Sequence, residues 1–374
     1  MMTTILPAVY WQILAISFLT ALLSTPIWMR LARWLGAVDP PDDRKIHDKP
    51  VLYLGGLSFH ASFAAVLVVV LWRCPYLVES SVWQNKWLAL FAGSTLMLVL
   101  GIVDDLRCLK PQTKLIGQIV LAFSLVACGF RFEVVTDPLG GGPIHLGALG
   151  WVLSVFWIVA IANAVNLVDG LDGLAAGVVL FAACANLAIS LSPWQGFVGL
   201  ISLVLIGATL GFLPYNFYPA RVFMGDAGSL YLGTLLGASA IESSVKSTTV
   251  VSLLFPLVAL LIPLLDTGLA VIRRSRRGQH LFAADREHIH HRLLRLGLSH
   301  RQAVLLLHAL CLLLAASAYL GSQLPDHLTI LYLSVIAGTV IWGFWVFSFL
   351  ERRITQISGH PDRRIASKVA SEEE

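Results

Sequence analysis

Two amides and two carboxylates recur at every third position between Asn163 and Asp172, directly after an apolar run from Trp151 to Ile161. In a helix, residues three apart lie on the same side, so neighbours in this series should lie close together. A carboxylate at the centre of a bilayer costs about 2.5 to 3.5 kcal/mol, which places these side chains at an interface or in a polar cavity. A polar helix end capped by Gly170 and Gly173 is the simpler explanation. It does not explain why so many acids adjoin apolar runs, namely Asp104, Asp105, Asp169, Asp172, Asp226 and Asp266.

The other acids suggest a site for a divalent cation. Asp104 and Asp105 end an apolar run, where adjacent like charges need a cation to offset them and oppose the helix dipole. Asp226 lies between two glycines before another run, so the following helix N-terminus can face an anion while Asp226 holds a cation. Mg²⁺ prefers oxygen ligands and shares them with substrate phosphates. We therefore predict a Mg²⁺ site at these acids. The alternatives are proton transfer by Asp104 and Asp105, or helix ends that merely tolerate the acids.

Three histidines, His288, His290 and His291, follow an arginine-rich segment that contains Arg274. Their close spacing raises the possibility of zinc. However, His at i, i+2 and i+3 cannot all face one point on a regular helix, and neither an H-E-x-x-H motif nor a cysteine partner accompanies them. We favour an anion site built from arginine and histidine. Anionic lipid headgroups would explain the arginines but not the histidines.

A basic segment near the N-terminus contains Lys45 and His47 and is followed by the glycine pair Gly55 and Gly56. Its charges are suited to bind phosphate, and the glycines would permit close helix approach. A positively charged cytoplasmic loop would also explain the charges. It explains the histidine and the glycine pair less well.

The composition indicates an all-α, polytopic membrane protein. The 374 residues are 57% hydrophobic and only 13% charged, with a mean hydropathy of +0.78, which excludes an ordinary soluble protein. Apolar runs near the ~20 residues needed to cross a bilayer recur along the chain, and we count eleven. They run from Ala8 to Met29, Tyr53 to Trp72, Trp87 to Val103, Leu115 to Phe130, Leu149 to Asn166, Leu174 to Leu191, Phe197 to Pro214, Ser229 to Ile241, Val250 to Ile272, Ala303 to Leu320 and Leu328 to Leu350.

Lys and Arg predict the orientation, because 22 of them lie on the face of the acidic motifs and 4 on the other. The positive-inside rule places the motif face in the cytoplasm, the N-terminus outside and the C-terminus inside. Residues 1–350 are expected to form one transmembrane catalytic domain, with 273–302 as its largest cytoplasmic loop and 351–374 as a polar tail. On the outer face, the Gly140–Pro143 turn and its alternating flanks predict a small β-hairpin.

In this order and at these span ends, the motifs from about Asp39 to His291 resemble those of the polyprenyl-phosphate N-acetylhexosamine-1-phosphate transferases. The resemblance is strongest to the bacterial branch that uses UDP-GlcNAc, since the muramyl-pentapeptide branch carries consecutive histidines instead of His-Ile-His-His. It implies transfer of GlcNAc-1-phosphate from UDP-GlcNAc to undecaprenyl phosphate with release of UMP, the first membrane step of a cell-envelope polysaccharide. The cofactor implied is Mg²⁺, with Mn²⁺ as a substitute, and the location is the bacterial inner membrane with a cytoplasmic active site.

The resemblance also implies roles for individual residues. Phe223 matches an aromatic that can stack on uracil, and Arg274 matches an arginine that contacts the diphosphate or sugar. One departure is that Leu52 and Tyr53 stand where the family usually has Pro and often Arg. The implied catalytic residues are Asp104, Asp105, Asp169, Asp172, His288 and His291, the substrate-binding residues are Lys45, His47, Lys114, Asn166, Phe223, Arg274 and His290, and the metal ligands are Asp226 and Asp105.

Two alternatives stay open. The same reaction could use another UDP-N-acetylhexosamine, including UDP-MurNAc-pentapeptide. An ion-coupled transporter also places acids near broken helices, but its acids gather near the membrane midplane, and we find no inverted repeat of the motifs. No nucleic acid is expected as a partner. A homodimer is compatible with small residues such as Gly233, Gly237 and Ala238, which suit helix packing within or between chains.

Overall fold

The computed structural model of the protein describes residues 2–39, 50–73, 81–137, 142–191, 196–246, 260–276 and 288–357. Helices dominate the described chain, and its four strands form two short antiparallel pairs. The helices are α1 (Met2–Leu35), α2 (Leu57–Arg73), α3 (Ser81–Arg107), α4 (Pro111–Ala127), α5 (Gly147–Val168), α6 (Leu174–Ser190), α7 (Gly196–Asn216), α8 (Gly225–Lys246), α10 (Leu261–Arg276), α11 (Ile289–Arg295), α12 (His300–Ser322) and α13 (Asp326–Ile357). The strands are β1 (Val38–Asp39), β2 (Val51–Leu52), β3 (Val134–Asp137) and β4 (Gly142–His145).

Ten of the eleven predicted spans fall on helices of the described chain, which confirms the all-α class. In the described part of the chain, six helices are long and apolar enough to cross a membrane: α1, α3, α5, α7, α12 and α13. Three further apolar helices, α2, α4 and α6, are shorter. The ninth predicted span begins in 247–259, outside the described residues, and α10 covers its second half. The count of eleven crossings and the orientation of the termini stay predictions.

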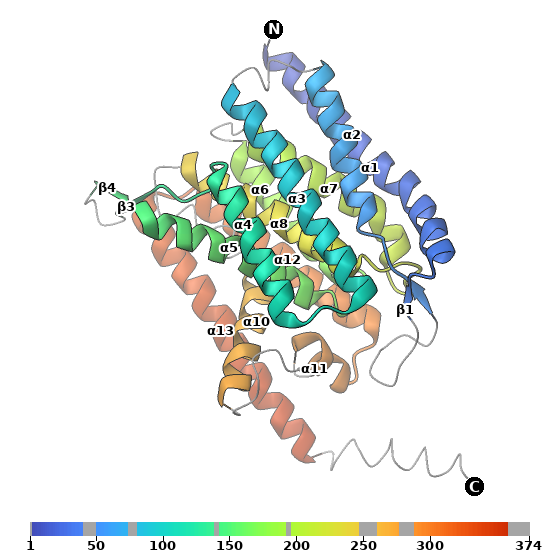
Figure 1. Ribbon diagram of the computed structural model, residues 1–374. Coiled ribbons are helices and arrows are strands. Elements are labelled where there is room, and N and C mark those ends of the chain that lie inside the picture. Colours follow the sequence, from blue (N-terminus) through green and yellow to red (C-terminus); the bar gives the residue numbers. More distant parts are fainter. Residues whose placement is uncertain are drawn as a thin grey trace.

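The predicted hairpin is present. β3 and β4 pair in antiparallel register, with Val134 opposite His145 and Asp137 opposite Gly142. The pair β1–β2 was not predicted, because two residues are too few to show an alternating pattern. The β1–β2 pair and α11 lie at the same end of the helical bundle (Figure 1).

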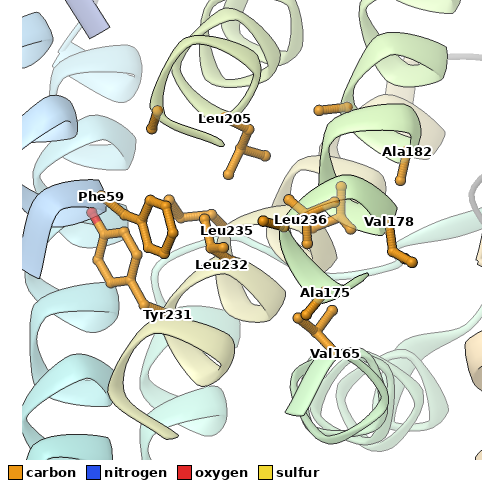
Figure 2. Close-up of a cluster of buried hydrophobic side chains, with 14 of the residues drawn as sticks. Phe59, Val165, Ala175, Val178, Ala182, Leu205, Tyr231, Leu232, Leu235 and Leu236 are labelled. Carbon is orange, nitrogen blue, oxygen red and sulfur yellow. The ribbon is translucent and has the colours of Figure 1, made fainter. Parts of the chain in front are cut away.

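Helix α8 is the centre of the bundle and packs against α2, α3, α5, α6 and α7. Its side chains from Ala227 to Ser243 are buried. Figure 2 shows part of this core, where Leu232, Leu235 and Leu236 of α8 lie among side chains of α2, α5, α6 and α7. Gly233 of α8 lies so close to α5 that an added Cβ would be 2.6 Å from Cα of Ala162. This small residue therefore serves packing within the chain.

The glycine pair after β2 brings a second segment close to the start of α8. The backbone N–H groups of Gly55 and Gly56 donate to the carbonyls of Phe223 (3.1 Å) and Met224 (3.2 Å). A Cβ on Gly56 would lie 2.4 Å from the backbone nitrogen of Gly228. The expected close approach is confirmed, and its partner is the segment that carries Asp226.

Replacing Gly56 by Val should therefore disrupt the bundle near the start of α8, because the added side chain meets backbone and not a flexible side chain. Overpacking of this kind costs about 1–3 kcal/mol or more, so we expect a clear fall in the midpoint of thermal unfolding in detergent. Gly343→Ala in α13 is the control, since a Cβ there meets nothing within 4 Å. Equal melting temperatures for the two variants would contradict the predicted clash.

Candidate active site

A cavity of about 550 Å³ opens where the ends of several helices meet. Its walls come from the last turn of α3, the C-terminal end of α5, the turn that follows it, the 216–226 segment and the starts of α11 and α12. The lining includes eight residues predicted from the sequence: Asp104, Asp105, Asn166, Asp169, Asp172, Phe223, Asp226 and His291. Side chains 187 positions apart in the sequence therefore share one polar cavity.

Lys114 joins two of the predicted acids. Its Nζ lies 2.8 Å from Oδ2 of Asp104 and also contacts Oδ2 of Asp226. Asn166 donates from Nδ2 to Oδ1 of Asp226 (2.6 Å) and to the hydroxyl of Ser229 (2.8 Å). The side chains of Asp104 and Lys114 are 11% and 16% exposed, so the ion pair is only partly screened by water. This network brings α3, α4, α5 and α8 together at one point.

Asp105 has a different environment from its neighbour. Its carboxylate accepts hydrogen bonds from the backbone N–H groups of Asp226 (2.8 Å) and Ala227 (3.1 Å), at the first turn of α8. A negative charge is favourable there, because these N–H groups have no partner within the helix. The anion expected at this helix N-terminus is thus supplied by the chain itself.

The Asn163–Asp172 series is helical only in its first half. Helix α5 ends at Val168, and Asp169 to Gly173 form a turn. Its last residue, Gly173, has a positive φ of 79° and is the N-cap of α6. Asn163 lies away from the acids and donates to Oε1 of Gln118 at 2.6 Å. The turn rotates the carboxylates of Asp169 and Asp172 into the cavity wall, which a regular helix would not do for the whole series.

Burial raises the pKa of Asp169 well above its usual value, and the carboxylates of Asp226, Asp105 and Asp172 raise it further. Both effects favour the protonated form of Asp169 as long as no further cation lies among these side chains. A cation bound there would favour the charged form of the carboxylates.

The predicted histidines have separate places. His288 is buried, and its Nδ1 lies 2.8 Å from Oδ2 of Asp266, whose other oxygen accepts the N–H of Ile289 at 3.0 Å. His291 lines the cavity, whereas His288 does not. For His290 only the backbone, at the start of α11, is described. The pair His288–Asp266 fastens the histidine segment to α10.

The remaining predicted residues are less informative. Arg274 lies in the last turn of α10, is partly buried and is not among the cavity-lining residues. Lys45 and His47 lie outside the described residues. Within the described ranges, no group of three or more His, Cys, Asp or Glu side chains is arranged to hold a metal ion.

The donor set nevertheless fits Mg²⁺ in its chemistry. The cluster offers carboxylate oxygens, which this ion prefers. Both oxygens of Asp105 already accept backbone hydrogen bonds. Oδ1 of Asp104 also accepts a backbone hydrogen bond, from Leu109 N–H at 2.8 Å. The oxygens best placed to contact a cation are therefore Oδ2 of Asp104 and Oδ2 of Asp226, provided that Lys114 gives up its contacts with them.

Nine lining residues were not predicted as site residues, and four of them have a polar or aromatic side chain of interest: Tyr53, Asn216, Tyr218 and His300. Asn216 accepts from the N–H of Gly173 (3.1 Å) and donates to the carbonyl of Val222 (3.0 Å), so it links the turn to the strand-like segment before Asp226. Tyr53 is one of the two residues that depart from the family pattern, and this departure could have pointed to Tyr53 as a site residue. The other three belong to no motif of charged residues.

The departure at Leu52 also has a structural consequence. Leu52 forms a parallel bridge with Val222, and its carbonyl accepts the N–H of Phe223 at 2.8 Å. This backbone pairing does not depend on side-chain type. Leu52 thus holds the backbone of Phe223, while the next residue, Tyr53, contributes to the cavity wall.

Comparisons with known proteins agree on one family. Residues 87–244 match the model of glycosyl transferase family 4. The chain is 40% identical over 303 residues to a probable undecaprenyl-phosphate N-acetylglucosaminyl 1-phosphate transferase of Bacillus subtilis, covering 81% of this chain and 82% of that protein. It is 38% identical to a decaprenyl-phosphate N-acetylglucosaminephosphotransferase of Mycolicibacterium smegmatis, over 75% and 74% of the two chains. It is also 37% identical to a phospho-N-acetylmuramoyl-pentapeptide-transferase of Desulforudis audaxviator, over 72% and 83%.

Proposed function

Because the chain belongs to the polyprenyl-phosphate N-acetylhexosamine-1-phosphate transferases of glycosyl transferase family 4, we propose that it transfers GlcNAc-1-phosphate from UDP-GlcNAc to undecaprenyl phosphate. The products are undecaprenyl-diphosphate-GlcNAc and UMP. We place the reaction on the cytoplasmic face of the bacterial inner membrane, as the first membrane step of an envelope polysaccharide such as O-antigen. The observation that carries the proposal is the network in which Lys114 and Asn166 hold Asp104 and Asp226 at the cavity.

In the proposed reaction, an oxygen of the lipid phosphate attacks the β-phosphorus of UDP-GlcNAc. One P–O bond forms there, and the bond from the β-phosphorus to the bridging oxygen breaks, so that UMP leaves with the electron pair. One diphosphate bond replaces another, so positioning and charge neutralisation matter more than driving force. Direct attack and a covalent aspartyl intermediate remain alternatives, and we favour direct attack.

The chain's own residues supply the positioning. Lys114, partly buried beside two carboxylates, is suited to draw a phosphate oxygen into the cavity. A carboxylate of the Asp104–Asp105 pair can orient the lipid phosphate or accept its proton. Phe223 and His291 line the same cavity and can contact the donor nucleotide and the sugar phosphate. Mg²⁺, when held by Asp226 and Asp104, would neutralise charge on the diphosphate and make UMP a better leaving group.

UDP-MurNAc-pentapeptide is the second candidate donor, because a phospho-N-acetylmuramoyl-pentapeptide-transferase is 37% identical to the chain, against 40% and 38% for two GlcNAc relatives. Identity alone does not separate the two donors. We favour UDP-GlcNAc on the His-Ile-His-His segment, whose His291 lines the cavity. The donor should therefore be tested directly.

The position of the acids weighs against a transporter. Asp104 and Asp105 lie in the last turn of α3, Asp169 follows the end of α5, and Asp226 lies in the first turn of α8. All therefore lie at helix ends and not halfway along them. An ion pathway through the membrane would place such groups near the midplane.

The direct test is release of UMP by purified protein in detergent, given undecaprenyl phosphate and either UDP-GlcNAc or UDP-MurNAc-pentapeptide, with Mg²⁺ or with EDTA. We expect release only with UDP-GlcNAc, lipid and Mg²⁺ together, and partial activity when Mn²⁺ replaces Mg²⁺. Release from the muramyl donor alone would move the chain to the other branch. Full activity in EDTA would refute the metal requirement.

A further inference from the structure

We infer that His300 is a positioning residue of this site, holding the Asp169–Gly173 turn through the backbone N–H of Asp172. The expected effect of His300 on turnover rests on the proposed function. The contact between His300 and the turn does not depend on which donor is used. His300 belongs to none of the motifs that led to the site. It is the first residue of α12, is 9% exposed and lines the cavity.

The hydrogen bond determines the state of the ring. Nε2 of His300 lies 2.9 Å from the backbone nitrogen of Asp172. A backbone N–H can only donate, so Nε2 accepts, and the neutral ring carries its proton on Nδ1. Nδ1 is buried and has no hydrogen-bond partner among the described residues. The imidazole therefore makes its polar contact with the turn and with nothing else in the described structure.

Contacts with Tyr218 hold the ring, and a capping box fixes the start of the helix that carries it. Ser299 and Gln302 form a capping box, with Gln302 N–H donating to the Ser299 hydroxyl (3.3 Å) and Ser299 N–H donating to Oε1 of Gln302 (2.9 Å). The imidazole also stacks on Tyr218, with ring centroids 4.5 Å apart and an interplanar angle of 26°. Arg301 adds a hydrogen bond to the carbonyl of Tyr218 at 3.3 Å. The start of α12 is thus a rigid support.

Besides the buried side chain of Leu171, two other hydrogen bonds join the turn to another segment within the described part of the chain. Oδ2 of Asp172 accepts the N–H of Ala220 at 2.8 Å, and Gly173 N–H donates to Asn216 at 3.1 Å. Both partners belong to the segment after α7, so His300 supplies the contact from the α12 side. Without it the N–H of Asp172 would be left without this acceptor, and the carboxylates of Asp169 and Asp172 would lose part of their support.

The test compares three variants. His300→Phe keeps a ring to stack on Tyr218 but cannot accept a hydrogen bond, whereas His300→Gln keeps an acceptor. His60→Phe is the matched control, because His60 also stacks on an aromatic ring, that of Phe91 at 5.0 Å, but does not line the cavity. We expect His300→Phe to lower kcat/KM for UDP-GlcNAc about tenfold, the size expected for loss of one buried hydrogen bond. His300→Gln should recover to within about threefold of the wild type, and His60→Phe should match the wild type.

Hydrogen–deuterium exchange supplies a readout that does not need turnover. Peptides that contain residues 169–173 should exchange faster in His300→Phe than in the wild type, and His300→Gln should restore protection. Unchanged exchange and unchanged kinetics in His300→Phe would overturn the inference. So would an equal loss in the Phe and Gln variants, which would show that a hydrogen-bond acceptor at this position does not restore function. A wild-type protein that releases no UMP from any donor would refute the proposed function, while the exchange experiment would still decide the role of His300.

Discussion

Asp226→Asn should reduce UMP release by about a thousandfold or more, the largest effect that we expect from one substitution at this site. Asp226 accepts from both Lys114 and Asn166. An amide in its place would turn an NH₂ group towards one of these donors and would remove the negative charge that a cation requires. The loss should appear in kcat, because charge on the diphosphate develops during the reaction.

Glu133→Gln is the control for this variant, because it makes the same chemical change at an exposed residue beside the β3–β4 hairpin. It should keep wild-type activity. Both proteins must elute as folded species and melt within a few degrees of the wild type. An Asp226→Asn protein with near-normal turnover in Mg²⁺ would show that the metal is held elsewhere.

Lys114→Met should also be severely impaired, with an expected loss of about a hundredfold in kcat/KM for undecaprenyl phosphate. The substitution removes the cation that lies between the carboxylates of Asp104 and Asp226. These acids would then repel each other, and the cavity would repel a phosphate. The measurement is the initial rate of UMP release at varied lipid concentration.

Lys110→Met is the matched control, since Lys110 lies four residues earlier, just before α4, and is exposed. Lys114→Arg should fall between the wild type and Lys114→Met, because it keeps the charge but changes the geometry. Equal rates for Lys114→Met and Lys110→Met would show that Lys114 has no role in the site. The contacts of Lys114 with Asp104 and Asp226 would then not matter for the reaction.

The helices and the motifs could be predicted from the sequence because both are local. An apolar run of nearly bilayer length specifies a helix whatever surrounds it. The glycine-rich turn between alternating flanks similarly specifies the β3–β4 hairpin. The cluster of Asp104, Asp169 and Asp226 could be foreseen in outline, because charged groups at the ends of apolar runs collect on the same face.

The different contacts of the Asp104 and Asp105 carboxylates could not be predicted from the sequence. The two neighbours have the same chemistry, and they differ because α3 crosses the first turn of α8. Gly101 permits that crossing, since a Cβ there would lie 2.4 Å from Cα of Ala227. Asp105 is thereby placed against the amides of α8, and Asp104 against Lys114.

The sequence by itself determined that this is a helical membrane protein with acids gathered at one end of its helices, because hydropathy and charge act residue by residue. Only the tertiary structure decided which of those acids line the cavity. It also decided that His288 pairs with Asp266 and that Tyr218 and His300 contribute to the cavity wall. Each of these depends on contacts between residues far apart in the chain, whose partners are chosen by how the helices pack and not by the residues beside them.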